Sequence, residues 1–166
     1  MTTLTITNGK LLLPGNAGPI AQELHIADDI IGGPGGEAID ADGMVVAPGI
    51  IDLGVFATDK PAFRFGGITR AALMPDQNPV HDDPATIRHA ALKGKPDFWV
   101  HPLAAATRDL DGQHMGEIAL MKDAGAKGVA TGRRWIADSG VMLRILKYCR
   151  ALDLPVFVHS EDGGLS

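Results

Sequence analysis

The sequence predicts an α/β protein in which a run of short strands precedes a series of alternating strands and helices. From Gly49 onward, apolar stretches of strand length alternate with segments of helical periodicity, which is the pattern of parallel βαβ units. Before that point, short alternating stretches are separated by turn-forming residues, as is typical of a small β-sandwich. Apolar residues make up 45% of the 166-residue chain, a share that indicates a folded domain.

Turn residues divide the first 47 positions into pieces of strand length. Asn8-Gly9 is a hairpin signal, and Asp28-Asp29 and Asp42-Gly43 mark two further turns. The strands expected between the turns cover residues 4–7, 11–13, 23–26, 30–31, 38–40 and 44–46.

The remainder of the chain is expected to form five strands and three clear helices. The strands cover residues 49–55, 68–74, 98–101, 127–130 and 156–159, and the helices cover residues 84–93, 112–124 and 139–152. Asp83, before Pro84, and Ser139 are candidate N-caps, and Gly125 suits a helix C-terminus. Only about a dozen residues separate the first two strands, which leaves room for one or two helical turns.

Charge and cysteine content exclude several classes of protein. The formal net charge of −5 argues against a nucleic-acid partner or an anionic membrane surface, since both require clustered Lys and Arg. No apolar run approaches the ~20 residues that a membrane span needs, and the N-terminus has no secretory signal pattern. The single cysteine, Cys149, cannot form an internal disulfide, so a cytoplasmic location is expected.

Three segments carry a resemblance to a known family. They are Pro-Gly-Ile-Ile-Asp-Leu at 48–53, Met-Pro-Asp-Gln-Asn-Pro at 74–79 and Val-His-Ser-Glu-Asp at 158–162. Together they resemble the amidohydrolase superfamily, and most closely the dihydroorotases. The resemblance implies a partial TIM (β/α) barrel of about five strands with an N-terminal β-sandwich segment. Residues 1–47 would form the N-terminal part of the small sandwich, and residues 48–166 the first half of the barrel.

The length of the chain bears on this interpretation. A closed eight-stranded barrel takes about 250 residues, so we expect the chain to be the N-terminal part of a longer protein. The alternative is a complete short chain that covers its open sheet edge by dimerising.

Dihydroorotases are zinc enzymes, and the resemblance implies where their metal ligands would lie. Two histidines of the family correspond to Gly54 and Phe56, neither of which can ligate zinc. The acid that bridges the metals has no counterpart in residues 129–135, and Lys127 lies at the wrong end of its strand. His159 is the one retained ligand position. Because a lone imidazole does not make a zinc site, we expect no cofactor in this chain and a hydrogen-bonded role for His159.

The substrate positions of the family are altered as well. Asp76 replaces an asparagine that binds substrate, and its carboxylate would repel the carboxylate of dihydroorotate. Asp76 is therefore a weakened candidate for substrate binding, and the alternative is that residues 75–79 form only a rigid turn. Arg133 and Arg134 are expected to be solvated or paired with acids, or else to hold a phosphate or carboxylate. No residue qualifies as catalytic.

The resemblance implies a role in pyrimidine biosynthesis, where dihydroorotases interconvert carbamoyl aspartate and dihydroorotate. The first hypothesis is a non-catalytic homologue that serves as a structural partner of the aspartate transcarbamoylase catalytic subunit or forms a homo-oligomer, without nucleic-acid or membrane partners. The second is an active metal-dependent cyclic-amide hydrolase completed by residues beyond Ser166. A third is an unstable gene fragment without function.

Overall fold

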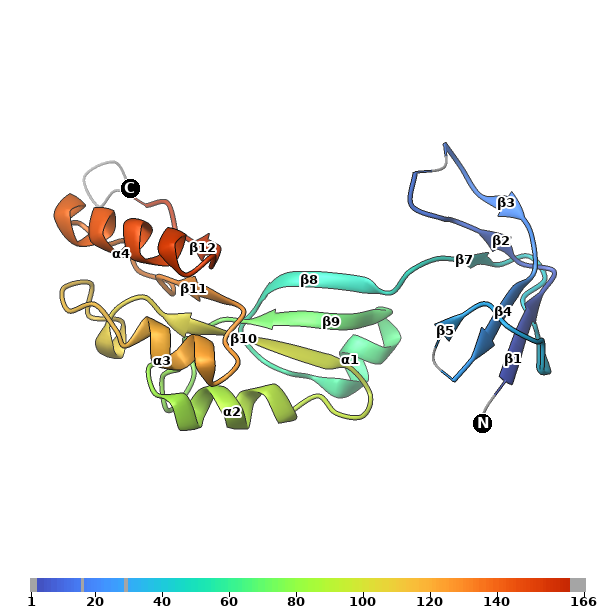
Figure 1. Cartoon of the computed structure of the whole chain (residues 1–166), viewed down its shortest axis with the longest axis horizontal. Helices are drawn as coiled ribbons and strands as arrows, with labels where there is room; N and C mark the ends of the chain where they lie inside the picture. Colours follow the sequence, from blue (N-terminus) through green and yellow to red (C-terminus); the bar gives the residue numbers. More distant parts are fainter. Residues whose placement is uncertain (1–2, 16, 29, 162–166) are drawn as a thin grey trace. The chain divides into compact units, whose positions relative to one another are not determined.

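A computed structural model describes residues 3–15, 17–28 and 30–161 (Figure 1). The chain divides into two compact units, residues 1–48 and 49–166. Within the described residues, no helix is both long enough and apolar enough to cross a membrane.

The first unit holds two small sheets, with strand orders β5-β4-β1-β6 and β3-β2-β7. The strands are β1 (Thr3–Thr7), β2 (Lys10–Leu11), β3 (Ile20–Ala21), β4 (Leu24–Ala27), β5 (Ile30–Ile31), β6 (Glu37–Asp40) and β7 (Val45–Val46). The hairpin predicted at Asn8-Gly9 is wrong, because β1 and β2 lie in different sheets. Asn8 has a φ of 60°, and its side-chain amide donates to Oδ1 of Asp40 at 2.9 Å. This turn therefore carries the chain from one sheet into the other.

The second unit is a curled parallel sheet with the strand order β12-β11-β10-β9-β8 (Figure 1). Its strands are β8 (Ile50–Val55), β9 (Ile68–Leu73), β10 (Trp99–Ala105), β11 (Gly128–Ala130) and β12 (Val156–Phe157). The connecting helices are α1 (Lys60–Phe65), α2 (Pro84–Leu92), α3 (Ile118–Asp123) and α4 (Ser139–Ala151), with a 3-10 turn at Arg108–Leu110. Sequential strands are neighbours, as in a (β/α) barrel opened between its first and last strand.

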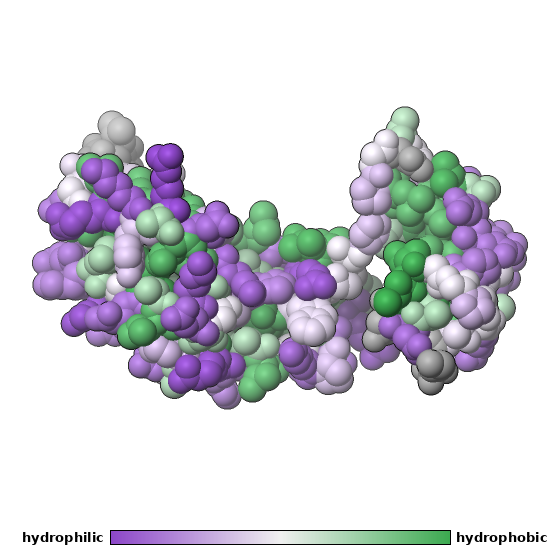
Figure 2. All heavy atoms as spheres, in the orientation of Figure 1, coloured by the Kyte–Doolittle hydropathy of each residue, from purple (hydrophilic) through white to green (hydrophobic). Residues whose placement is uncertain are grey.

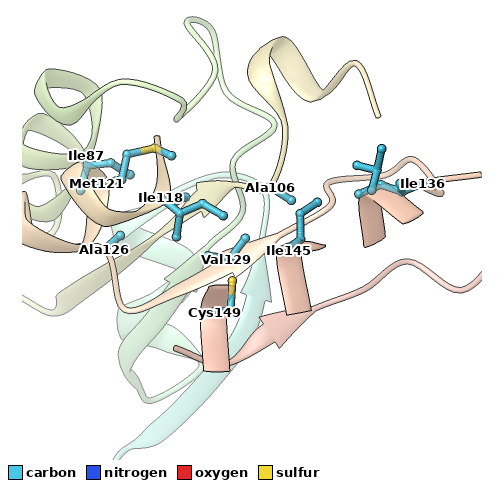
Figure 3. Packing of buried hydrophobic residues seen from close by; sticks show 11 residues of the cluster. Ile87, Ala106, Ile118, Met121, Ala126, Val129, Ile136, Ile145 and Cys149 are labelled. Atoms are coloured by element: carbon cyan, nitrogen blue, oxygen red, sulfur yellow. The ribbon is translucent and has the colours of Figure 1, made fainter. Parts of the chain in front are cut away.

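One face of this sheet is covered by the helices, and we call it the helix-covered face. Near β9, Leu73 and Val100 are buried together with Phe63 of α1 and Ala90 of α2. Near β11, Val129 is buried against residues of α3 and α4 (Figure 3). Ile118, Val129, Ile145 and Cys149 of that cluster project into the space between β11 and the helices. Burial raises the pKa of the Cys149 thiol to about 11, so this thiol stays protonated.

The opposite face carries a smaller apolar cluster and is otherwise uncovered, and we call it the open face. Ala72, Leu103 and Ala130 are buried there. Toward β8, by contrast, Ile51 and Leu53 are more than half exposed. Figure 2 shows hydrophobic residues at the surface of the second unit in this region.

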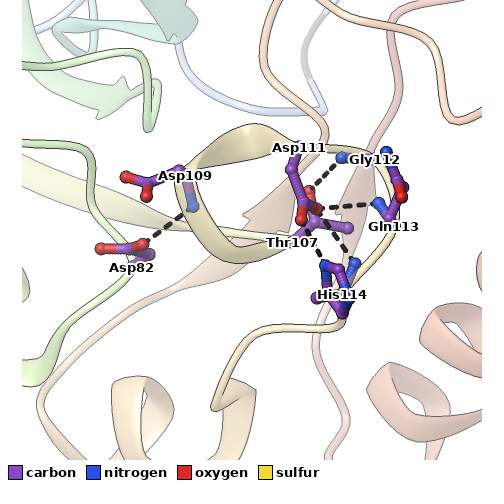
Figure 4. A network of polar contacts seen from close by, with 7 residues as sticks. All are labelled: Asp82, Thr107, Asp109, Asp111, Gly112, Gln113 and His114. Carbon is purple, nitrogen blue, oxygen red and sulfur yellow. Dashed lines mark hydrogen bonds and ion pairs between the residues drawn. The ribbon is translucent and has the colours of Figure 1, made fainter.

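The helix predicted over residues 112–124 is wrong in its first half, since α3 begins only at Ile118. The preceding residues form a loop held by polar contacts (Figure 4). The Asp111 carboxylate accepts the backbone N–H groups of Gln113 and His114 and lies 2.6 Å from Nδ1 of His114. These bonds lower the pKa of Asp111 to about 2. Gly112, at a φ of 75°, completes a turn that a helix cannot contain.

An aspartate side chain caps the N-terminus of both α2 and α4. Asp83 caps α2 as predicted, by accepting the Ala85 N–H at 2.7 Å. For α4 the predicted cap, Ser139, is wrong. Asp138 is the N-cap and accepts from Gly140 and Val141, at 2.7 and 3.0 Å. The Asp138 carboxylate lies one residue before Ser139 and accepts hydrogen bonds from two backbone N–H groups of the first helical turn. This explains why Asp138, and not Ser139, is the N-cap.

Candidate functional site at the carboxyl ends of the strands

The five parallel strands of the second unit end at one edge of the sheet, where (β/α) barrels carry their reactive groups. A cavity of about 240 Å³ lies at this edge, and we call it the mouth cavity. Gly54, Phe56, Met74, Arg133, Phe157 and His159 are among the residues that line it.

A guanidinium resting on an aromatic ring occupies one side of the mouth cavity. The guanidinium carbon of Arg133 lies 4.0 Å from the centroid of the Phe56 ring, within the range of a cation–π contact. The side-chain amide of Gln77 donates to the carbonyls of Phe56 and Met74, at 3.0 and 3.2 Å. The ends of β8 and β9 are thereby fixed to each other.

Asp76 holds the turn that follows β11. Its Oδ1 accepts the backbone N–H of Arg133 at 2.9 Å. Its Oδ2 is buried and has no hydrogen-bond partner among the described residues. Gly132 has a φ of 70°, and a Cβ there would lie 3.0 Å from Oδ1 of Asp76. Asp76 is not among the residues that line the mouth cavity, so substrate binding by this residue stays a prediction.

His159 lies in the mouth cavity and is held at two points. Its backbone N–H donates to Oγ1 of Thr131 at 3.1 Å, and Thr131 is buried. Its Nε2 lies 2.8 Å from Oε2 of Glu161, and both side chains are about half exposed. An imidazole next to a carboxylate can accept or donate a proton, although a pair this exposed adds little stability. Asp162, the last residue of the predicted motif, lies outside the described residues.

The residues at this mouth do not fit a zinc ion. Gly54 offers no donor atom, although a Cβ built there meets nothing within 4 Å. The Phe56 ring lies beneath a guanidinium, whose charge would repel a divalent cation. In the described part of the chain, no group of three or more His, Cys, Asp or Glu side chains is placed to hold a metal ion. Metal binding by His159 remains untested.

The contact between Phe56 and Arg133 could not be found from the sequence. Each residue is unremarkable by itself, and they meet only because β8 and β11 end at the same edge of the sheet. Arg134 and Trp135, next along the chain, are exposed and do not line the cavity.

No family model matches the chain. A dihydroorotase from Syntrophotalea carbinolica is 34% identical, over 98% of this chain and 43% of the relative. The chain thus spans about two fifths of the length of this curated relative.

Solved structures with the same fold include the L-hydantoinase (dihydropyrimidinase) from Arthrobacter aurescens. Its TM-score is 0.77 at 20% identity, over 98% of this chain and 41% of that one. An N-acyl-D-glutamate deacylase from Bordetella bronchiseptica, solved with zinc and a phosphonate inhibitor, has a TM-score of 0.67 and 22% sequence identity, over 96% of this chain and 45% of the deacylase chain. These likenesses confirm the predicted partial TIM barrel with an N-terminal β segment.

Proposed function

The chain is a divergent relative of the dihydroorotases, and on that premise we propose that it has no metal-dependent hydrolase activity of its own and acts as a structural partner protein. The observation that carries the proposal is the replacement of two ligand positions by Gly54 and by a Phe56 ring covered by Arg133. A dihydroorotase mechanism needs a metal to activate water. Among the described residues, the lining of the mouth cavity offers one imidazole, that of His159, toward such a site.

The proposed partner is the catalytic subunit of aspartate transcarbamoylase. The resemblance to the dihydroorotases suggests this partner, because some bacteria keep inactive homologues as structural partners of aspartate transcarbamoylase. The open face supports a partner role, because it exposes neighbouring apolar side chains, including Ile51 and Leu53, next to the cationic Arg70. Exposed apolar surface of this kind marks sites of protein association.

Three measurements on the purified chain test the proposal. We expect no stoichiometric zinc, no turnover of dihydroorotate, and co-elution with the transcarbamoylase catalytic subunit on size-exclusion chromatography. Leu53→Asp, on the open face, should abolish co-elution. Leu143→Asp is the matched control, since Leu143 is similarly exposed but lies on α4. Loss of co-elution with both variants, or with neither, contradicts the assignment of the open face.

The second candidate function is an active cyclic-amide hydrolase with an unusual metal site. The contact between Glu161 and His159, which lines the mouth cavity, favours it, because such a pair can move a proton. Stoichiometric zinc together with turnover of dihydroorotate would establish this function and exclude the first.

A further inference from the structure

The mouth cavity combines apolar walls with two ionisable side chains. Its walls include apolar side chains at the ends of three strands, namely Leu53, Met74, Phe157 and Val158. Among the described lining residues, only Arg133 and His159 have ionisable side chains, and none has a carboxylate. Apolar walls with a few polar groups are the usual composition of a small-molecule site. At about 240 Å³ the cavity lies below the range for drug-sized ligands, so its ligand has to be small.

Arg133 is positioned by its neighbours although its side chain is accessible. Its backbone N–H donates to Asp76, and its guanidinium carbon lies 4.0 Å from the centroid of the Phe56 ring. None of the ion pairs among the described residues includes Arg133. A guanidinium stacked on a ring presents its N–H edge for a bidentate contact with a carboxylate. Arg133 is therefore a positioned charge without a counterion in the described part of the chain.

The acids close to the mouth cavity do not compensate this charge. Asp76 and Glu161 do not line the cavity, and each is already bonded elsewhere. Asp76 accepts the backbone N–H of Arg133, and Glu161 lies 2.8 Å from Nε2 of His159. The charge that faces the cavity is thus positive and favours an anion. The residues that do not fit zinc supply a positive charge of their own.

We propose that the mouth cavity binds a small monocarboxylate with an apolar body. Its carboxylate contacts the guanidinium of Arg133, and its apolar part lies against Leu53, Met74 and Phe157. The sequence left open whether Arg133 or Arg134 holds an anion, and only Arg133 lines the cavity. A guanidinium binds a carboxylate but does not supply the metal-activated water that hydrolysis of a cyclic amide needs. This binding role goes beyond the proposed partner role and does not depend on it.

Isothermal titration of the 166-residue chain at pH 7.5 compares 4-methylpentanoate, its neutral amide 4-methylpentanamide, and dihydroorotate. The carboxylate should bind about tenfold or more tightly than the amide, because only the carboxylate forms charge-assisted hydrogen bonds with a guanidinium. It should also bind more tightly than dihydroorotate, whose polar ring would lose hydration against apolar walls. Equal affinity for carboxylate and amide, tighter binding of dihydroorotate, or no binding of 4-methylpentanoate overturns the proposal.

Two neighbouring exposed arginines provide a matched pair of variants that leave the core intact. Arg133→Gln should weaken the binding of 4-methylpentanoate about tenfold, because it removes the cation from the cavity. Arg134→Gln should not change the affinity, since Arg134 does not line the cavity. Equal effects of the two variants contradict the assignment.

Treatment of the chain with EDTA separates this inference from the proposed lack of a metal site. The affinity for 4-methylpentanoate should be the same before and after treatment, because a guanidinium and not a metal ion holds the carboxylate. Loss of binding after treatment would assign the binding to a metal ion and overturn both proposals. Loss of binding in Arg133→Gln together with failed co-elution would overturn the partner role alone.

Discussion

The two faces of the parallel sheet differ in what covers them. On the helix-covered face, large apolar residues such as Leu73 and Val129 are fully buried beneath helices. On the open face, Leu53 of β8 is 62% exposed and Trp99 of β10 is 50% exposed. The described residues therefore form a finished core on one side of the sheet only.

The open face also carries charged and polar side chains near its exposed apolar residues. Arg70 donates to Nε2 of His101 at 3.5 Å, and its guanidinium lies 5.7 Å from the centre of a Trp99 ring. Burial, followed by the charges of Arg70 and Lys127, lowers the pKa of His101. This comparison predicts that the helix-covered face contributes most of the stability of the second unit.

Two leucines on neighbouring strands test this division most strongly. Leu73→Ala should lower the free energy of unfolding by about 3 kcal/mol, because it leaves a cavity beneath α1 and α2. Leu53→Ala should change it by less than about 0.5 kcal/mol, because that side chain is mostly in solvent. Urea denaturation measures both values. Equal losses would mean that the open face is buried in solution, for instance against a second copy of the chain.

His81 should make the free energy of unfolding depend on pH. Its pKa is lowered by burial from an ordinary value of 6.5 to about 4, so below pH 6.5 the unfolded chain binds a proton that the folded chain does not. The free energy of unfolding should therefore fall between pH 6.5 and pH 4, by about 3 kcal/mol at most, and this contribution is constant above that window. Urea denaturation at several pH values measures the slope. His81→Asn should flatten the profile, and an unchanged slope would show that other groups cause it.

Two glycines at the mouth cavity provide a smaller contrast. Gly132→Ala should cost about 2 kcal/mol, because its φ is 70° and the new Cβ would lie 2.9 Å from Cδ1 of Leu110. Gly54→Ala should be close to neutral, since the space around that position is open. Thermal unfolding of the two variants checks the difference. If both variants lost stability equally, the turn formed by Gly132 and Asp76 would not hold the mouth together.

Local patterns in the sequence were enough to predict the strands and most helices of the second unit. Asp83 and Pro84 fix the start of α2 through local chemistry, so this boundary was predicted correctly. The start of α3 was not, because the side chain of Asp111 competes with a helix by bonding Gln113 and His114. Such competition depends on one side-chain rotamer, which helical periodicity does not show.

The candidate site was predictable only in part. The absence of donor atoms at Gly54 and Phe56 follows from residue identity alone. The guanidinium over Phe56 and the bond from Arg133 to Asp76 depend on which strand ends lie together, so they appear only in the folded chain. Neither has a signature in sequence spacing.

The most direct test of the central claim introduces histidine side chains as zinc ligands at positions 54 and 56. The claim is that the mouth cavity lacks ligand atoms and not space, because Gly54 has open surroundings and lines the same cavity as His159. Zinc binding is measured by isothermal titration for the unaltered chain, for Gly54→His alone, and for Gly54→His combined with Phe56→His. We predict stoichiometric binding only for the double variant, which places three imidazoles around one cavity. Equally tight zinc binding by the unaltered chain would contradict the account.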